Sequence, residues 1–129
     1  MGLVIIDYIQ LMKGSRRANN RAGELTEISR GLLALAKDVD APVVVLSQLN
    51  RGVESRPNKR PVMSDLKESG AMEEDADVVI LLYRDEEYNK EPDNPNKGIA
   101  EIIIGKGRDI GTWTVKAGFD GERHNFHDL

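Results

Sequence analysis

The sequence contains no cysteine, which excludes a disulfide framework and any metal site with cysteine ligands. Its two histidines stand in a carboxy-terminal His124-x-x-His127 spacing, which gives little support for a zinc site. No apolar run approaches the roughly 18 residues of a membrane-spanning helix, and the first residues do not form a signal peptide. There is no internal repeat. We therefore expect a cytoplasmic protein that does not act on a membrane.

The sequence also lacks a surface that is basic throughout. Its 129 residues carry a net charge of −4, and 40% of them are hydrophobic, which suffices for the core of one domain or of a piece of one. The charges are segregated along the chain. Residues 13–21 hold four bases and no acid, residues 51–60 are mostly basic, and residues 85–93 are mostly acidic. A polyanion would therefore meet particular loops.

Near the amino terminus, four apolar residues end abruptly in a carboxylate. Residues 3–6 read Leu-Val-Ile-Ile, a run without polar alternation, and this predicts a strand buried on both faces. Asp7 follows the strand at its carboxyl end, the edge where open parallel α/β sheets bind ligands. An aspartate there either holds Mg²⁺ on a nucleotide phosphate or merely caps the following turn. A chain that enters a buried strand so early is expected to lack strands and a helix that precede it.

The next segment changes period and then returns to a strand. Apolar residues recur every three or four positions over residues 24–39, which is typical of an amphipathic helix. Residues 43–46 form a second apolar run, expected to be another strand buried on both faces, and Ser47 and Gln48 follow it. The strand, helix and second strand together predict a right-handed parallel crossover.

The remainder of the chain predicts further strands separated by polar segments. Residues 49–63 have no period and residues 85–97 alternate in charge, so both are expected to be loops, the second solvated on the surface. A short helix is expected over residues 64–75, interrupted at Gly70. Because the polar turn at residues 105–111 is short, its flanking strands should form an antiparallel hairpin. The expected strands are residues 78–82, 99–104 and 113–116, with a short edge strand at residues 123–126.

Four polar residues follow these predicted strands and would cluster on one rim of a sheet: Asp7, Gln48, Lys106 and Arg108. A phosphate site needs a metal-holding acid, a neutral group near the terminal phosphate and cations for developing charge, and this set supplies all three. The glycine-rich loop GxxxxGK[ST] that cradles phosphates does not occur. In the alternative interpretation, Gln48 bonds only to backbone and the two cations are solvated turn charges.

Three segments carry a resemblance to a known family: LVIIDYIQLM, VVVLSQLNRGVESRPNKRPVMSDLKESGAMEEDADVVILLYR and EIIIGKGRDIGT. From Leu3 onward the chain resembles the carboxy-terminal half of the RecA-like ATPase domain of DnaB-type hexameric replicative DNA helicases. The resemblance implies an α/β fold, a partial RecA-like three-layer P-loop NTPase core, with a mostly parallel sheet and a carboxy-terminal antiparallel hairpin. It implies an enzyme that uses ATP to move along single-stranded DNA and unwind duplex at the replication fork.

The resemblance also assigns roles in nucleotide chemistry. Asp7 matches the Walker-B aspartate, which holds Mg²⁺ on ATP. Gln48 matches a glutamine that couples the nucleotide state to DNA binding. Lys106 and Arg108 match bases that reach the nucleotide of a neighbouring subunit. The chain departs from the common pattern at Gly107 and Asp109, where the family more often has a polar residue and asparagine.

DNA-binding roles follow from the same resemblance. The residues that match Lys67, Glu68 and Gly70 lie on a loop facing the central channel and hold the single-strand backbone. Many members have arginine where this chain has Lys67. Lysine keeps the positive charge but cannot bind a phosphate through two parallel hydrogen bonds as arginine does. In the alternative interpretation, Lys67 and Glu68 are a surface pair on a helix. The basic segment 13–21 matches a second channel loop, less sharply, with Arg16, Arg17 and Arg21 as its cations.

The resemblance implies that identical subunits form a ring, as a hexamer in the full-length protein, and that a primase and a helicase loader are partners. The Walker-A loop, the catalytic glutamate and an amino-terminal domain are expected to lie upstream of residues 1–129, so this piece alone is expected to be inactive. The rival hypothesis is a non-catalytic doubly wound α/β binding or signalling domain, in which Asp7 accepts a phosphoryl group or caps a turn. Tyr8 and Gln10 are interpreted as structural.

Overall fold

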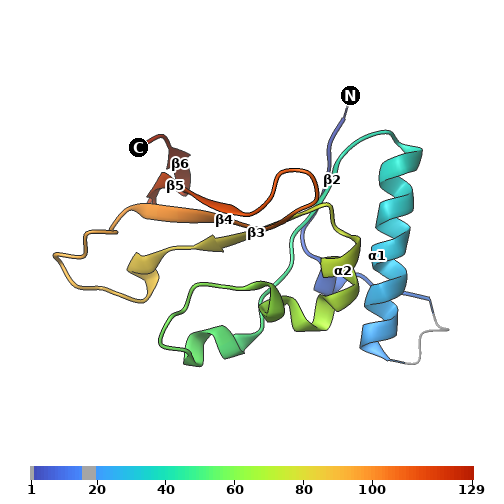
Figure 1. Cartoon of the computed structure of the whole chain (residues 1–129), viewed down its shortest axis with the longest axis horizontal. Coiled ribbons are helices and arrows are strands. Elements are labelled where there is room, and N and C mark those ends of the chain that lie inside the picture. The colour runs from blue at the N-terminus through green and yellow to red at the C-terminus, as the bar shows by residue number, and fades with distance from the viewer. Residues whose placement is uncertain (1, 16–19) are drawn as a thin grey trace. The chain divides into compact units, whose positions relative to one another are not determined.

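The computed structural model describes residues 2–15 and 20–129, and the chain divides into two compact units, each with its own sheet (Figure 1). No helix within the described residues is both long enough and apolar enough to cross a membrane. The first unit comprises Met1–Lys59 and Met63–Ala76, and the second comprises Arg60–Val62 and Asp77–Leu129.

The first unit contains the predicted parallel crossover. Strand β1 (Val4–Ile6) pairs in parallel with β2 (Val43–Val45), and helix α1 (Arg21–Asp38) connects them. The helix begins three residues earlier than the apolar period indicated. The side chain of Asn20 accepts a hydrogen bond from the Gly23 N–H at 2.8 Å, and this cap satisfies a donor that the first turn would otherwise leave unpaired.

The core of the first unit lies on one side of this strand pair. Ile9, in the 3₁₀ helix η1 (Ile9–Leu11), is fully buried against Leu25 and Ile28 of α1. Four partly buried apolar residues complete this core: Met12, Leu32, Val45 and Met72.

The opposite side of the same strand pair is exposed. Ile5 and Val44 stand opposite each other in the register, with 62% and 47% of their surface accessible. The prediction that both strands are buried on both faces is therefore wrong for this chain. The reason is that the described residues supply cover for only one face of the pair.

The chain between β2 and the second sheet is more ordered than a loop. Residues 49–63, predicted to be irregular, include the 3₁₀ helix η2 (Arg51–Ser55). The expected short helix is present as the 3₁₀ segment η3 (Met63–Ser69), which is kinked at Leu66 and is followed directly by α2 (Gly70–Asp75). The helix type changes at Gly70, but no irregular residue separates the two elements. The Ser29 hydroxyl of α1 donates to Asp75 at 2.7 Å and holds α2 against α1.

The second unit is an antiparallel sheet in the order β3-β4-β5-β6. The predicted hairpin and edge strand are both present, but β3 also pairs antiparallel with β4. Only β1 and β2 pair in parallel among the described strands, so the expected mostly parallel sheet is not what this chain forms by itself. The strands are β3 (Val78–Tyr83), β4 (Ile99–Gly107), β5 (Trp113–Asp120) and β6 (Asn125–His127).

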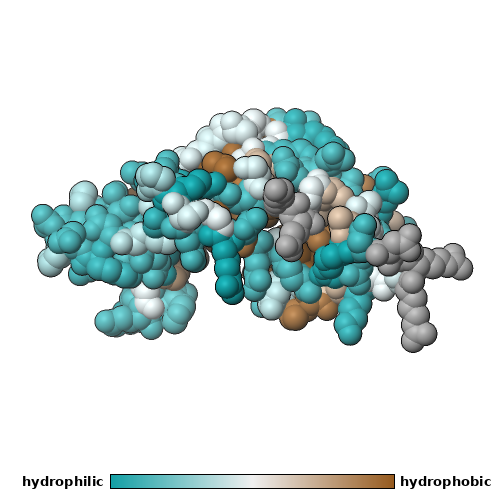
Figure 2. Space-filling view, turned by 90° about the horizontal axis from the view of Figure 1, so that it is seen from below, coloured by the Kyte–Doolittle hydropathy of each residue, from teal (hydrophilic) through white to brown (hydrophobic). Residues whose placement is uncertain are grey.

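Strand β3 alternates between a buried and an exposed face. Val79, Leu81 and Tyr83 are buried, whereas Ile80 and Leu82 are 55% and 59% exposed. The apolar run was predicted to be fully buried, and the structure contradicts that prediction. An uninterrupted apolar sequence shows that both faces of a strand are apolar, not that both are covered. Figure 2 shows hydrophobic atoms reaching the surface among hydrophilic ones.

The acidic segment 85–97 is not simply a solvated loop. It opens with the 3₁₀ helix η4 (Asp85–Glu87), and Asn94 is only 7% exposed. The Asn94 side-chain amide donates to the Asp85 carboxylate at 2.9 Å, and the Tyr83 hydroxyl donates to the other oxygen of that carboxylate at 2.9 Å. These hydrogen bonds lower the pKa of Asp85, that from Tyr83 most of all, and fasten the segment to the end of β3.

Candidate functional site

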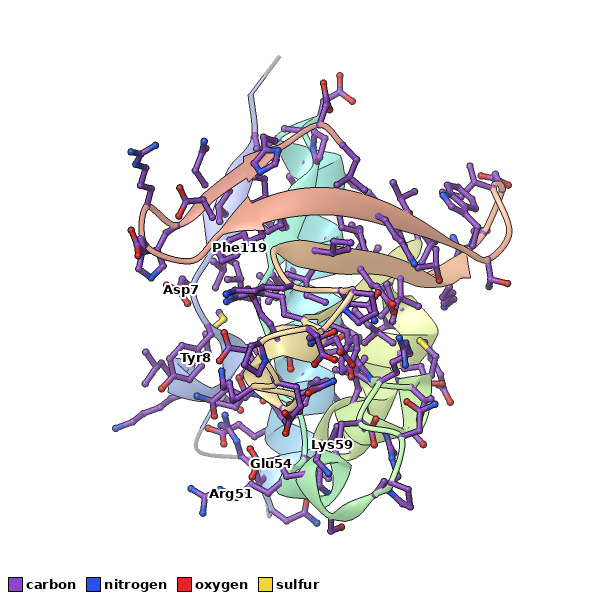
Figure 3. All side chains as sticks on the ribbon, turned by 90° about the vertical axis from the view of Figure 1, so that its left-hand side faces the viewer. Asp7, Tyr8, Arg51, Glu54, Lys59 and Phe119 are labelled. Carbon is purple, nitrogen blue, oxygen red and sulfur yellow. The ribbon has the colours of Figure 1, made fainter. Side chains whose placement is uncertain are left out.

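The structure brings Asp7 and Gln48 to the same edge of the parallel strand pair. Beyond the strands, the Leu46 N–H donates to the Ile6 carbonyl at 2.9 Å and the Ile9 N–H donates to the Leu46 carbonyl at 3.0 Å. The two segments that carry Asp7 and Gln48 therefore continue side by side past the carboxyl ends of β1 and β2. Figure 3 shows Asp7 and Tyr8 where the chain leaves β1.

The Asp7 carboxylate is open to solvent at the end of β1. The side chain is exposed, and it forms no hydrogen bond or ion pair with any residue that the structure describes. Nothing there supports the alternative in which Asp7 caps a turn. No group of three potential metal ligands occurs within residues 2–15 and 20–129. A single carboxylate suits Mg²⁺, which takes its remaining ligands from water and phosphate.

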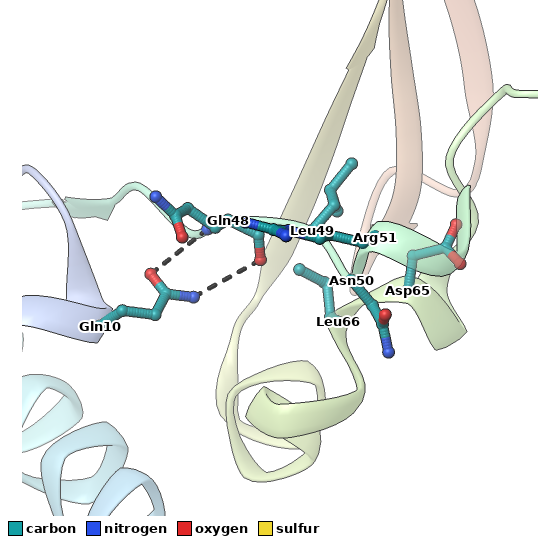
Figure 4. A pocket seen from close by; sticks show the side chains of 7 residues that line it. All are labelled: Gln10, Gln48, Leu49, Asn50, Arg51, Asp65 and Leu66. Carbon is teal, nitrogen blue, oxygen red and sulfur yellow. Dashed lines mark hydrogen bonds between the residues drawn. The ribbon is translucent and has the colours of Figure 1, made fainter. Parts of the chain in front are cut away.

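Gln48 is held by its backbone while its side chain remains exposed. Its N–H donates to Oε1 of Gln10 at 3.3 Å, and its carbonyl accepts from Nε2 of Gln10 at 3.5 Å (Figure 4). The same Nε2 donates to the Ser47 hydroxyl at 3.1 Å. Sequence reasoning treated Gln10 as structural, because nothing in the pattern around it indicated a partner at position 48.

Gln10 and Gln48 also line a pocket of about 330 Å³ in the first unit (Figure 4). Arg51 brings a cation to its lining, and Asp65 lines it as well, although the carboxylate of Asp65 is engaged by Arg56 at 2.8 and 2.9 Å. The other lining residues are Leu49, Asn50 and Leu66.

The predicted DNA-binding residues are described unevenly. The backbone of Lys67 and Glu68 lies in η3, but their side chains lie outside the described part, as do Arg16 and Arg17 altogether. Gly70 is exposed, and a Cβ added there would meet no described atom within 4 Å. The backbone at Gly70 is therefore open to approach from solvent.

Arg21, also predicted to bind DNA, is engaged within the chain. Its guanidinium donates to the carbonyls of Met12 and Gln10, both at 3.0 Å, and pairs with Glu24 at 2.5 Å. Glu24 in turn accepts from the Gly14 N–H at 2.6 Å. The bonds from Arg21, then that from Gly14, lower the pKa of Glu24. Through Glu24, these bonds connect Gly14 and Arg21, which lie near the two ends of the basic segment 13–21.

Lys106 and Arg108 belong to the second unit, so the predicted grouping of all four residues on one rim remains a prediction. Lys106 is half-buried in β4, opposite Val79 of β3. Strand β4 extends three residues beyond its predicted end at Ile104, so the turn is shorter than expected and Arg108 is its first residue.

This turn also explains the glycine at position 107. A Cβ there would lie 2.6 Å from the Gly111 carbonyl oxygen, too close for any other residue type. Gly111 itself has a φ of 75°, in the left-handed region that favours glycine. In this chain the turn therefore leaves no room for a side chain at position 107.

Comparison with known proteins gives a consistent result along the whole chain. A family described as "DnaB-like helicase C terminal domain" matches residues 1–128. The "Replicative DNA helicase DnaB" of Geobacillus stearothermophilus is 52% identical over 130 residues, which cover 100% of this chain and 28% of that protein. The chain thus spans less than a third of this relative.

Two solved structures are also similar. One is described as an "ATPase Domain", with a TM-score of 0.91 and 45% identity over 98% of this chain and 44% of that one. The other, described as a "DnaB-Like Replicative Helicase And Its Interactions With Primase", has the same TM-score and identity over 98% of this chain and 31% of that one.

Proposed function

The chain belongs to the family of DnaB-like helicase C-terminal domains, and from this premise we propose that it is the carboxy-terminal part of the RecA-like ATPase domain of a replicative DNA helicase. The full-length protein would couple ATP hydrolysis to movement along single-stranded DNA and unwind duplex. The observation that carries the proposal is the shared edge of Asp7 and Gln48, where both side chains are exposed beside the ends of a parallel strand pair.

In this proposal Asp7 holds Mg²⁺ and Gln48 responds to the nucleotide. Mg²⁺ bound to ATP supplies positive charge that neutralises the phosphates. The exposed Asp7 carboxylate would orient that ion, and the Gln48 amide, which makes no intramolecular bond in the described part, can reach the terminal phosphate or its attacking water. The phosphate-cradling loop and the general base would come from residues outside this chain.

Lys106 and Arg108 would act on the nucleotide of a neighbouring subunit. Arg108 opens the turn after β4 and 58% of its side chain is exposed, so it can extend away from its own sheet. A cation inserted from a neighbour stabilises charge that develops during phosphoryl transfer. This role requires identical subunits in a ring, and we propose a hexamer.

Single-stranded DNA would be held through its backbone. Lys67 supplies a cation, and Glu68 and Gly70 stand beside it on the same helical segment. The open space at Gly70 would let backbone amides approach phosphates. Arg16 and Arg17 are proposed as further cations, whereas we assign Arg21 to holding the base of their loop. Contacts with the DNA backbone do not depend on the base sequence, and their contribution to affinity decreases as the salt concentration rises.

The proposed partners follow from the relatives. One similar structure is described by its interactions with primase, and we propose primase and a helicase loader as partners of the full-length protein. Because the relative from Geobacillus stearothermophilus is a replicative DNA helicase, we propose a cytoplasmic location.

A chimera tests the proposal. This chain would replace the matched segment of the Geobacillus stearothermophilus relative, and ATP hydrolysis and duplex unwinding would be measured. We expect both activities, and we expect Asp7→Ala to abolish both without preventing assembly. A chimera that assembles but neither hydrolyses ATP nor unwinds DNA would favour the rival, a non-catalytic binding or signalling domain.

A further inference from the structure

We propose that Gln10 is a positioning residue for Gln48 and thereby links the turn that follows Asp7 to the response of the protein to nucleotide. This inference rests on the proposed function. Its basis is the pair of hydrogen bonds that the Gln10 amide makes with the backbone of Gln48, 38 positions away, one in which it accepts and one in which it donates.

The chemistry of this contact is specific for a carboxamide. Gln10 must accept from the Gln48 N–H and donate to the Gln48 carbonyl at the same time. Glutamine carries both functions on one planar group, whereas ionised glutamate can only accept. The donation from Nε2 to the Ser47 hydroxyl at 3.1 Å adds a third point of attachment. The Gln10 side chain therefore forms hydrogen bonds with two consecutive residues after β2, Ser47 and Gln48.

The backbone around Gln10 makes contacts with the core and with α1. The residue before it, Ile9, is fully buried in the core, and the Ile9 N–H is bonded to Leu46. The carbonyl of Gln10 accepts from the Arg21 guanidinium at 3.0 Å. Gln10 is half-buried and its bond to the Ser47 hydroxyl is partly buried, whereas its two bonds to the Gln48 backbone are exposed to water. The backbone around Gln10 is thus linked to the segment that follows β2 and to the first residue of α1.

The consequence concerns the transmission of movement. Gln10 lies three residues after Asp7, so a shift of that turn on nucleotide binding would carry the Gln10 amide with it. The amide would then move the backbone of Gln48, whose own side chain stays exposed. A residue that only stabilised the fold would not influence how strongly nucleotide affects DNA affinity.

The experiment uses the full-length chimera and measures single-stranded DNA affinity with an ATP analogue and with ADP. The ratio of the two affinities is the coupling between nucleotide and DNA. Gln10→Met keeps a side chain of similar length but removes the donor and the acceptor. We expect the coupling ratio to fall roughly five- to tenfold, the scale of a typical coupling between two sites, with little change in nucleotide affinity.

Two further variants guard against a purely structural explanation. Gln10→Glu keeps the acceptor for the Gln48 N–H and loses the donor, so its coupling ratio should lie between those of the unchanged chimera and Gln10→Met. Ser47→Ala removes only the third bond and should have the smallest effect. A drop in melting temperature for Gln10→Met without a change in coupling would overturn the inference.

A double-mutant cycle separates this inference from the proposed function. If Gln10 acts through Gln48, then Gln10→Met should cause no further loss of coupling when Gln48→Ala is already present. Equal losses in both backgrounds would show that Gln10 does not act through Gln48. If Gln48→Ala alone leaves the coupling intact, the proposed role of Gln48 fails, and the role of Gln10 fails with it.

Discussion

Arg108 is paired with Asp77 at the start of the second sheet. A guanidinium nitrogen of Arg108 lies 2.6 Å from an Asp77 carboxylate oxygen, and the Arg108 N–H donates to the Asp77 carbonyl at 2.9 Å. The two side chains are 58% and 62% exposed, so water screens their attraction. The backbone bond fixes the start of the turn, whereas an exposed side-chain pair of this kind contributes little stability.

This pairing predicts a gain of activity from an acidic residue outside the proposed site. If Arg108 contacts nucleotide as proposed, Asp77→Asn removes a carboxylate that would compete with the phosphates for Arg108, and it leaves the backbone bond in place. ATP hydrolysis by the chimera should rise by about 1.5- to fivefold, the scale of an exposed ion pair. Asp109→Asn, in the same turn, is the control. A fall in hydrolysis with Asp77→Asn would show that Asp77 orients Arg108 instead of competing for it.

Lys67→Ala should weaken single-stranded DNA binding about equally for all sequences. Because the proposed contact is with one phosphate, the slope of log affinity against log salt should decrease by roughly 0.7, the value for one charge on a single strand. Lys37→Ala removes an exposed cation in the last turn of α1 and serves as the control. Losses that depend on base sequence would argue for readout of bases at Lys67.

The stability of the second unit should depend on pH through Glu101. The Arg60 guanidinium donates to its carboxylate at 2.7 and 2.8 Å, and these bonds hold the pKa of Glu101 below its ordinary value of 4.5. A depressed pKa in the folded state stabilises the protein above the ordinary pKa, and this contribution disappears as pH falls through the folded value. The free energy of unfolding should therefore decrease below about pH 4.5.

Glu101→Gln checks this assignment. The variant should be less stable than the unchanged chain at pH 7, because Arg60 loses a charged partner, but its stability should change less between pH 5 and pH 3. Denaturant unfolding can be followed by the fluorescence of the single tryptophan, Trp113, in the neighbouring strand β5. Glu122→Gln, at an exposed position, should retain the full pH dependence. An unchanged profile for Glu101→Gln would assign the dependence to other carboxylates.

The 129-residue chain by itself should hydrolyse no ATP and should self-associate. It contains no phosphate-cradling loop, and apolar residues such as Ile5, Ile80 and Leu82 are more than half exposed on its strands. Light scattering at rising concentration and a sensitive phosphate assay would measure both properties. A monomer at high concentration, or turnover that Asp7→Ala abolishes, would contradict this prediction.

The sequence predicted those features that depend on local pattern. The change of period from strand to helix and back predicted the parallel crossover, and the positions of Asp7 and Gln48 after apolar runs placed them at one edge. The short polar turn predicted the hairpin between β4 and β5. These features follow from neighbours along the chain, which a single sequence displays directly.

Features that depend on distant partners could not be predicted in this way. The contact of Gln10 with Gln48 joins residues far apart in sequence, and neither residue type is unusual for a surface. Asn94 lies in an acidic stretch typical of solvated loops, and only its bond to Asp85 explains its burial. The apolar runs also could not show which face of each strand this chain covers.

The central claim is that Asp7 and Arg108 of different subunits complete one ATP site, and mixing two inactive variants tests it most directly. Each variant, Asp7→Ala and Arg108→Ala, should assemble and bind nucleotide but hydrolyse it poorly. Asp7→Ala loses the carboxylate that we propose holds Mg²⁺. Arg108→Ala loses an arginine that, acting in trans, contributes about 10³- to 10⁵-fold in rate. In a mixed ring some interfaces join an intact Asp7 to an intact Arg108. Mixing should therefore restore measurable ATPase activity, whereas activity no higher than the average of the two variants would contradict the claim.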